Sequence, residues 1–172
     1  PDATGHASLP GALHLDTYSI TGEHCVSVSD IMQAAAGELQ RITMNSGTLL
    51  VDAGTDALTA TGGLVQVKNA MLGGTLSGTT RVELLGDAVL SGANSHSGGT
   101  TIATGSLRLG HAQALGSGAV SLGSRARSRS ATPRLDMDNL PVSNQLIISG
   151  SSELAGTEHF TGSITMQEGS EL

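Results

Sequence analysis

The chain has 172 residues and a formal net charge of −7, with one tyrosine, one phenylalanine and no tryptophan. Its 38% hydrophobic residues and modest charge argue against a disordered chain, and its length is sufficient for one domain with a core. The scarcity of aromatic side chains argues against a thick globular core and, with the acidic charge, against nucleic-acid binding. Burial must therefore come from Leu, Val, Ile, Met and Ala.

The ends of the chain and its single cysteine give few constraints on function. Cys25 stands alone, so no internal disulfide can form. No apolar run approaches the roughly 20 residues of a membrane span, so we expect no membrane insertion of this segment. No signal peptide opens the chain, and the sequence begins at Pro1 and stops at Leu172 in mid-pattern. We therefore expect a piece of a longer protein.

The first part of the chain, residues 1–44, is expected to be an irregular, inserted or capping region ahead of the strands at 45–172. Within it, "SDIMQAAAGELQRI" (residues 29–42) predicts a short helical insertion near residues 30–42. Ile31, Leu39 and Ile42 would share one face, with Ala35 between them, and Ser29 or Asp30 can cap the helix.

Strand signals recur along the rest of the chain as short triplets of an apolar, a polar and an apolar residue. Such alternation with period 2 indicates a strand with one buried face. Turn residues such as Gly, Ser, Asn and Asp follow each triplet within a few positions. The triplets are Val65–Val67, Val82–Leu84, Leu107–Leu109, Val120–Leu122, Leu135–Met137 and Ile164–Met166.

The spacing of these triplets is irregular, and no Asn-Gly or Asp-Gly dipeptide joins two of them as a tight hairpin would require. Short strands, glycine corners and no hairpin signal favour parallel stacking of successive coils. We therefore expect an all-β parallel β-helix (β-solenoid), with a β-sandwich as the competing fold.

The segment "SRARSRSATPR" (residues 124–134) holds half of the eight basic residues of the chain. Together with its serines, threonine and proline, this composition indicates an exposed loop between two coils. It is either a solvated loop, a protease-sensitive site or a basic contact for an acidic partner such as a heparin-like glycan. The candidate partner-binding residues are Arg125, Arg127, Arg129 and Arg134.

Candidate catalytic and metal-binding residues do not form a known pattern. The six histidines (His6, His14, His24, His96, His111 and His159) lack metal-ligand spacing. Asp136 and Asp138 would share one strand face, as calcium or acid–base pairs do in polysaccharide-cleaving β-helices, but an ordinary solvent face has the same pattern. Serine-nucleophile elbows and phosphate loops are also missing. We expect a protein that is not an enzyme and that has no catalytic residue, metal or cofactor.

One segment carries a more specific pattern, "SGANSHSGGTTIATGSLRLGHAQALGSGAV". It closely resembles the passenger-associated transport repeat of bacterial autotransporters, and the resemblance covers about 30 residues. The chain departs from that repeat at His96 and Ser97, where an aromatic or similar residue is usual. The matching positions are Ser91, Gly92, Asn94, Gly98, Gly99, Thr100, Thr101, Ile102, Gly105, Leu107, Leu109, Gly110, Ala114, Leu115 and Gly116.

The resemblance implies a right-handed parallel β-helix that a C-terminal translocator barrel, outside this chain, carries through the outer membrane (type V secretion). The repeat implies a role in secretion and folding, with the protein exposed at the bacterial cell surface or secreted. Within the repeat at residues 90–122, a regular coil such as 98–122 would be a good folding nucleus. Its inward residues would be Ile102, Leu107, Leu109, Leu115, Val120 and Leu122.

Three functions follow from these expectations. The first is a non-catalytic β-helical stalk that supports secretion and displays a virulence or adhesion surface. The second is a binding module, an adhesin that captures a host cell-surface protein, a serum protein or a glycan through its loops. A polysaccharide-active β-helix enzyme is the third.

Overall fold

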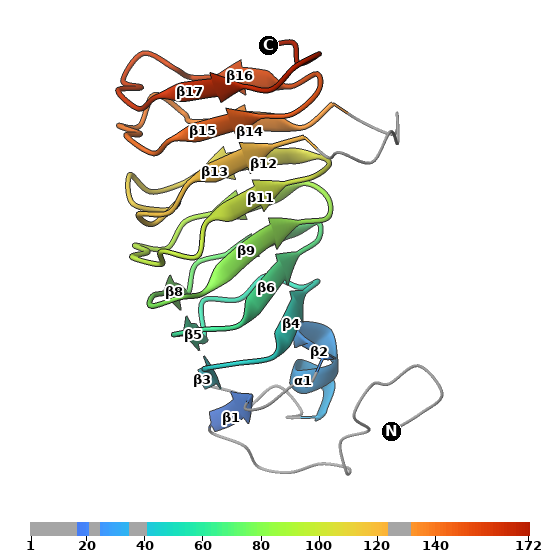
Figure 1. Cartoon of the computed structure of the whole chain (residues 1–172). Helices are drawn as coiled ribbons and strands as arrows, with labels where there is room; N and C mark the ends of the chain where they lie inside the picture. Colours follow the sequence, from blue (N-terminus) through green and yellow to red (C-terminus); the bar gives the residue numbers. More distant parts are fainter. Residues whose placement is uncertain (1–16, 21–24, 35–40, 124–131) are drawn as a thin grey trace.

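The computed structural model describes residues 17–20, 25–34, 41–123 and 132–172. In these ranges the chain is mostly β, and parallel sheets form a β-solenoid of about six turns with little helix. Figure 1 shows the coils stacked from the N-terminal to the C-terminal end. The expected β-solenoid is thus confirmed. The competing β-sandwich is wrong, because the strand pairs within each sheet are parallel.

The described strands form three sheets, each built from strands of successive coils. The eight-stranded sheet contains β2 (Cys25–Ser27), β4 (Thr48–Val51), β6 (Leu64–Val67), β9 (Arg81–Leu84), β11 (Thr100–Ile102), β13 (Val120–Leu122), β15 (Leu146–Ile148) and β17 (Ile164–Met166). The five-stranded sheet contains β7 (Ala70–Leu72), β10 (Ala88–Leu90), β12 (Ser106–Leu109), β14 (Arg134–Asp136) and β16 (Glu153–Ala155). The four-stranded sheet contains β1 (Thr17–Ile20), β3 (Arg41–Met44), β5 (Leu58–Ala60) and β8 (Thr75–Leu76).

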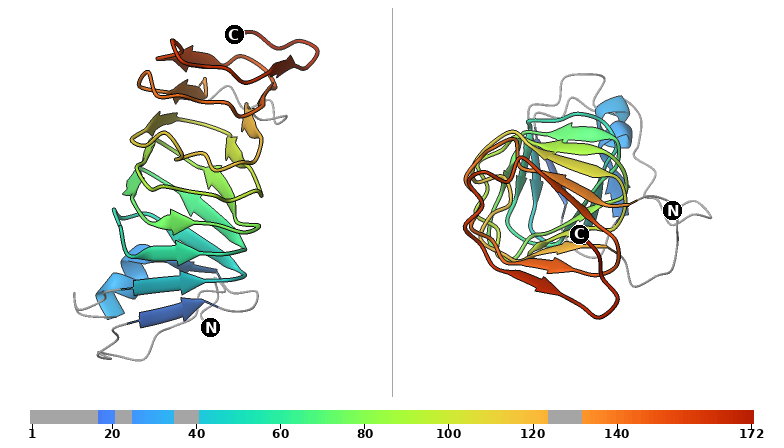
Figure 2. Two further views of the ribbon diagram at one scale, coloured as in Figure 1. Left: turned by 90° about the vertical axis from the view of Figure 1, so that its left-hand side faces the viewer. Right: turned by 90° about the horizontal axis from the view of Figure 1, so that it is seen from above.

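The core is a narrow column of aliphatic side chains that runs the length of the rod. Figure 2 shows the sheets arranged around this interior when the molecule is viewed along its axis. Strands β6, β9 and β13 all bury alternate residues, because side chains along a strand point to opposite faces. The inner residues then stack on those of the next coil, as Val65 does opposite Val82 and Val67 opposite Leu84. The expected aliphatic core is confirmed.

The helix is present, but it begins earlier and is shorter than expected. The seven-residue α1 (Val28–Ala34) contacts β2 and β4, and Val28 and Ile31 are fully buried. Its N-cap is Ser27, whose Oγ accepts a hydrogen bond from the backbone N–H of Asp30 at 3.1 Å. The predicted cap at Ser29 or Asp30 is therefore wrong. Ser29 instead donates its Oγ–H to Asp52 Oδ2 at 2.6 Å.

The predicted extension of the helix to Ile42 is also wrong. Ile42 lies in β3, where its side chain and that of Met44 are buried and alternate with Arg41 and Thr43. This is the period of a strand, and it places Ile42 opposite Leu58 of β5 in parallel register. Ile31 and Ile42 would share one face of a continuous helix, but Ile31 lies in α1 and Ile42 lies in β3.

The first coils include strands from the region expected to be irregular. β1 pairs with β3, β2 with β4 and β3 with β5, so strands before residue 45 continue the sheets that follow it. Residues 1–16 lie outside the described ranges, and a domain boundary between residues 44 and 45 stays a prediction. None of the helices in the described ranges is long and apolar enough to cross a membrane.

The inner ladder gives a direct stability prediction. Leu107 is fully buried in β12, opposite Ala88 and Leu135 of the two adjacent coils. We expect Leu107→Ala to lower the free energy of unfolding by about 2–5 kcal/mol in urea denaturation, since it opens a cavity between coils. The neighbouring Arg108→Ala, on the outer face, should cost only about 0–1 kcal/mol, the usual value of an exposed ion pair. Equal losses would contradict the assigned strand faces.

Candidate functional site: the repeat coil

The residues that resemble the transport repeat lie in one stretch of chain that leaves β10, contains β11 and β12 and ends before β13. Most of its apolar positions face the core, and Thr101 points outward. The coil therefore presents most of these residues to the coils above and below it rather than to solvent. Its buried residues are Gly92, Asn94, His96, Thr100, Ile102, Leu107, Leu109, Ala114 and Leu115.

The motif glycines lie at the corners of the coil, where successive turns of backbone meet. Gly116 has a φ of 63°, and an added Cβ would lie 2.7 Å from His96 Nδ1 and against the His96 carbonyl oxygen. Gly105 has a φ of 79°, and its Cβ would lie 2.6 Å from the carbonyl oxygen of Gly86. Both positions thus require glycine for conformation and for space. The remaining motif residues at the turns are Ser91, Gly92, Gly98, Gly99 and Gly110.

Asn94 is a buried polar residue that joins three coils. Its Oδ1 accepts a hydrogen bond from the backbone N–H of Leu76 at 2.9 Å, in the preceding coil. Its Nδ2 donates to the carbonyl oxygen of Ala114 at 2.7 Å, in the following coil. Because both partners are backbone groups, the amide replaces strand pairing at a corner where the ladder is interrupted. Its position in the motif is explained by this bridge.

His96 is a buried polar residue of the repeat coil whose contacts the motif analysis did not predict. It is fully buried, and its Nε2 lies 3.2 Å from Thr100 Oγ1, which is also buried. Its Nδ1 has no hydrogen-bond partner among the described residues. Its backbone oxygen accepts a hydrogen bond from the N–H of Ser117 at 2.9 Å, so the residue links its coil to the next. The signal in the sequence is its place before the double glycine, where the chain departs from the repeat that it resembles.

The environment of His96 favours its neutral form. Burial lowers the pKa of His96 from its ordinary value of 6.5, because the charged imidazolium would lose its hydration. A neutral ring has one donor and one acceptor nitrogen, and either of these can serve the hydroxyl of Thr100. The ring therefore bonds to Thr100 within its own coil, and the His96 backbone oxygen bonds to the next coil.

The arginine segment is only partly described, and one of its residues lies in a strand instead of the predicted loop. Arg125, Arg127 and Arg129 lie outside the described residues. Arg134 is not a loop residue, because it lies in β14 with its guanidinium on the outer face of the sheet. It pairs with Glu153 at 2.6 Å in the next coil and with Asp136 at 3.6 Å. Its charge is therefore already compensated within the solenoid.

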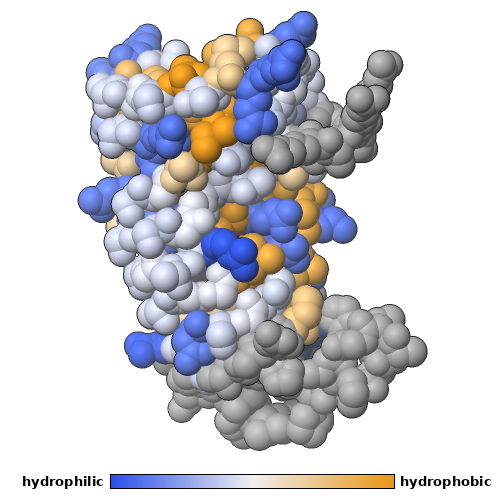
Figure 3. All heavy atoms as spheres, in the orientation of Figure 1, coloured by the Kyte–Doolittle hydropathy of each residue, from blue (hydrophilic) through white to orange (hydrophobic). Residues whose placement is uncertain are grey.

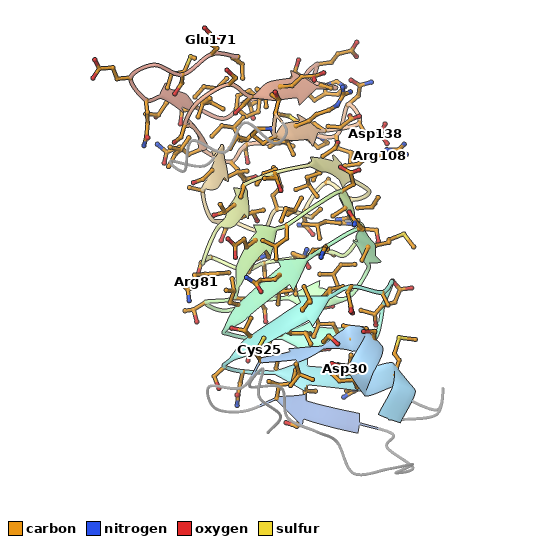
Figure 4. The ribbon with its side chains drawn as sticks, turned by 90° about the vertical axis from the view of Figure 1, so that its right-hand side faces the viewer. Cys25, Asp30, Arg81, Arg108, Asp138 and Glu171 are labelled. Atoms are coloured by element: carbon orange, nitrogen blue, oxygen red, sulfur yellow. The ribbon has the colours of Figure 1, made fainter. Side chains whose placement is uncertain are left out.

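Asp136 and Asp138 do not form an isolated carboxylate pair. Asp138 forms an ion pair with Arg108, with 3.1 Å between the guanidinium nitrogen and Asp138 Oδ2. Figure 4 shows these two side chains pointing toward one another. Asp136 Oδ1 accepts a hydrogen bond from the backbone N–H of Asp138 at 3.0 Å, in a turn where Asp138 has a φ of 49°. The two carboxylates thus shape a turn and bind arginines, as expected for a solvent face.

The remaining candidate residues do not converge on one site. Within the described ranges, no group of three or more His, Cys, Asp or Glu side chains is placed to hold a metal ion. Cys25 is exposed on β2, beside an open groove that also includes Thr48, Leu64 and Arg81. A second groove, of about 600 Å³, lies over β7, β10 and β12, with Met71, Val89 and Arg108 in its lining. Among the candidate residues, those of the repeat coil are the ones that contact one another and the adjacent coils in the described structure.

Comparisons with known proteins leave the family open: no protein family, no curated protein and no solved structure matches the chain.

The close packing around Gly116 predicts that alanine is more destabilising there than at a glycine with open space around it. Gly116→Ala should destabilise the protein through an unfavourable positive φ and a clash with His96, the clash alone adding about 1–3 kcal/mol. Gly150→Ala is the matched control, because Gly150 has a φ of 88° with nothing within 4 Å of its Cβ position. Urea denaturation of both variants separates conformational strain from close packing. Equal destabilisation would contradict the proposed contact.

Burial of His96 predicts an acid-dependent loss of stability. Since the folded pKa is lowered below 6.5, the unfolded state binds more protons at a pH between the two values. The stabilisation is fully present above pH 6.5 and is lost as the pH falls toward the folded pKa. We expect urea denaturation to show lower stability at about pH 5.5 than at about pH 7.5. His96→Gln should remove part of this difference in stability. An unchanged pH dependence in that variant would contradict the role assigned to His96.

Proposed function

We propose that this chain is a segment of a bacterial autotransporter passenger, a non-catalytic β-helical stalk whose repeat coil supports folding and secretion. The observation that carries the proposal is the placement of the repeat residues. Asn94, the corner glycines and the inward leucines all act at contacts between coils. A motif used for catalysis or binding would instead present polar side chains outward.

Folding physics connects this placement with secretion. In a solenoid each coil contacts only its neighbours, so stability is a sum of local terms and folding can begin at one coil. The repeat coil combines fully buried Leu107 and Leu109 with the bridge made by Asn94. A coil that folds early outside the outer membrane would prevent the chain from sliding back, and adjacent coils would then add to it.

The cellular setting belongs to the same proposal. The stalk would lie at the extracellular face of the outer membrane or be released from it, with its own translocator barrel as the first partner. The stacked coils of the solenoid would keep a host-binding region away from the membrane. A host protein or glycan would then be bound by loops or by flanking sequence, and the solenoid would serve as the support.

A display assay tests the folding role. The chain is placed between a secretion signal and an autotransporter translocator barrel in a Gram-negative bacterium, and surface protein is measured with an antibody. Leu107→Asp should abolish display, because it buries a charge in the repeat coil. Leu49→Asp is the matched control, since Leu49 is equally buried in β4 but lies outside the repeat. Display should fall less with Leu49→Asp, and equal losses would argue against a special role for the repeat.

The same assay distinguishes a stalk from a binding module. Deleting residues 124–131 removes Arg125, Arg127 and Arg129 but keeps Arg134 and its ion pair with Glu153. A stalk predicts normal display and normal adhesion of the cells to host ligands. Normal display with lost adhesion, and adhesion that weakens steeply with salt, would instead identify an arginine-driven binding module.

A further inference from the structure

The groove over β7, β10 and β12 combines apolar and polar side chains on one outer face of the solenoid. Met71 lies opposite Val89 and Val89 lies opposite Arg108, so these three residues form a row across the five-stranded sheet. Asn69 and Asp87 line the same groove from the positions that precede β7 and β10. The groove has a volume of about 600 Å³, within the range of small-molecule sites, roughly 300–1,000 Å³.

Two polar side chains of this groove are held in place by backbone groups. The N–H of Asp87 donates to Asn69 Oδ1 at 3.1 Å, and the N–H of Ser106 donates to Asp87 Oδ1 at 2.9 Å. A Cβ on Gly86 would lie 2.5 Å from Asn69 Oδ1, so this glycine leaves room for the amide. Both Asn69 and Asp87 are exposed, and Asn69 Nδ2 and Asp87 Oδ2 have no hydrogen-bond partner among the described residues. The groove therefore offers a held donor beside a held acceptor, which lowers the entropy lost on binding.

Apolar side chains lie beside this polar pair. Met71 is 52% exposed, and Ala70 and Val89 are half-buried in the lining of the groove. Figure 3 shows hydrophobic surface next to hydrophilic surface on the right-hand side of the rod, near its middle. Apolar contact combined with a few placed polar groups is typical of sites for small ligands. A ligand that fits this groove therefore has an apolar face and polar groups at its edge.

The charges of the groove favour a neutral ligand. In the described part of the chain, the charged residues that line it are Asp87 and Arg108, whose formal charges are opposite. Arg108 also pairs with Asp138 at 3.1 Å. A strongly anionic ligand, such as a sulfated glycan, would meet the two aspartates, and a strongly cationic one would meet the arginine. Charge complementarity therefore selects a polar but uncharged ligand.

The backbone at the centre of the groove is not available for an added strand. β10 pairs with β7 on one side and with β12 on the other. Its N–H and C=O groups are therefore used within the sheet, and a peptide cannot bind to β10 by strand addition. Recognition in this groove has to come from side chains, which suits a compact ligand with several hydroxyl groups.

We propose that this groove binds a neutral saccharide. One sugar ring lies with its C–H face against Met71 and Val89, and two neighbouring hydroxyls bond to Asp87 Oδ2 and Asn69 Nδ2. A hydroxyl can donate and accept, so one hydroxyl donates to the carboxylate while the next accepts from the amide. Because hydrogen bonds to a charged carboxylate are the stronger ones, Asp87 supplies most of the polar recognition. This inference goes beyond the stalk role and does not rest on the proposed secretion function.

Binding of neutral disaccharides to the intact chain tests the proposal. The probes are lactose, cellobiose and N,N′-diacetylchitobiose, and binding is measured by saturation-transfer difference NMR. We expect at least one of the three to bind, with the strongest saturation on the C–H protons of one ring. Absence of binding by all three would overturn the proposal. A heparin disaccharide that binds as tightly as the neutral probes would also overturn it, because the groove would then not select an uncharged ligand.

Variants of the chain locate the saccharide site. Asp87→Asn keeps the Oδ1 that accepts from Ser106 but replaces Oδ2 by a donor, so it should weaken binding about tenfold. Met71→Gln should also weaken binding, because it removes apolar contact with the ring. Asp30→Asn is the matched control, since Asp30 is exposed on α1 outside the groove, and its dissociation constant should change less than about twofold.

Thermal unfolding of the same variants separates a loss of binding from a loss of fold. We expect Asp87→Asn and Met71→Gln to unfold close to the temperature of the unmodified chain, because both residues are exposed. If both variants bind the disaccharide as well as the unmodified chain does, the ligand binds elsewhere and the proposal is wrong. Equal weakening by Asp30→Asn would have the same meaning.

Discussion

The spacing between neighbouring coils is the constraint on which the structure depends. Adjacent strands in a sheet lie about 4.7–4.9 Å apart, so every turn must repeat the same cross-section at that interval. Inner side chains stack directly on their equivalents, as Val65, Val82 and their neighbours do, and the buried apolar residues are almost all aliphatic. Tyr18 and Phe160 are the only aromatic residues in the chain, which suits so narrow a column.

The same spacing explains the polar and glycine positions of the repeat. At a corner, backbone from two coils approaches too closely for a Cβ, which accounts for Gly105 and Gly116. Where the ladder is interrupted, backbone groups would be buried without partners, and the Asn94 amide supplies those partners to both adjacent coils. His96 fills the space beside Gly116 with a ring that can still bond to Thr100. A single coil thus combines apolar stacking with side chains that mimic the backbone.

Much of the fold was predictable from local patterns. Five of the six predicted triplets lie within strands, because their outward residues are polar and make the alternation visible. The sixth, Leu135–Met137, overlaps β14, which ends at Asp136. Other strands were missed because an apolar residue points outward and hides the period, as Met71 does in β7 and Ile147 in β15. The helix boundary failed because Ile42 fits a helical face in projection but is held in β3 by pairing with β5. Only contacts between coils, which composition does not encode, decide such cases.

Prediction of the candidate site was also limited because contacts between coils are not visible in the sequence. The leucines and glycines of the repeat were recognisable as a set, whereas the burial of His96 depends on the coil that closes over it. Arg134 resembled the other arginines of its segment, yet it belongs to β14 because Leu135 faces inward and aligns with Leu107 and Leu154. Glu153 then lies opposite Arg134 in the adjacent strand. Charge composition cannot separate a strand residue from its neighbours in a loop.

The interval between β13 and β15 has a consequence for the variability of such proteins. Val120 faces Leu146 in register, although the corresponding step from β6 to β9, Leu64 to Arg81, takes fewer residues. The extra length, which includes residues 124–131, leaves the stacking of both neighbouring coils unchanged. Entropy of loop closure grows only slowly with length, so the connection between β13 and β14 can differ in length at little cost. The chain can therefore accept an inserted epitope between these two strands while the stacked core stays the same.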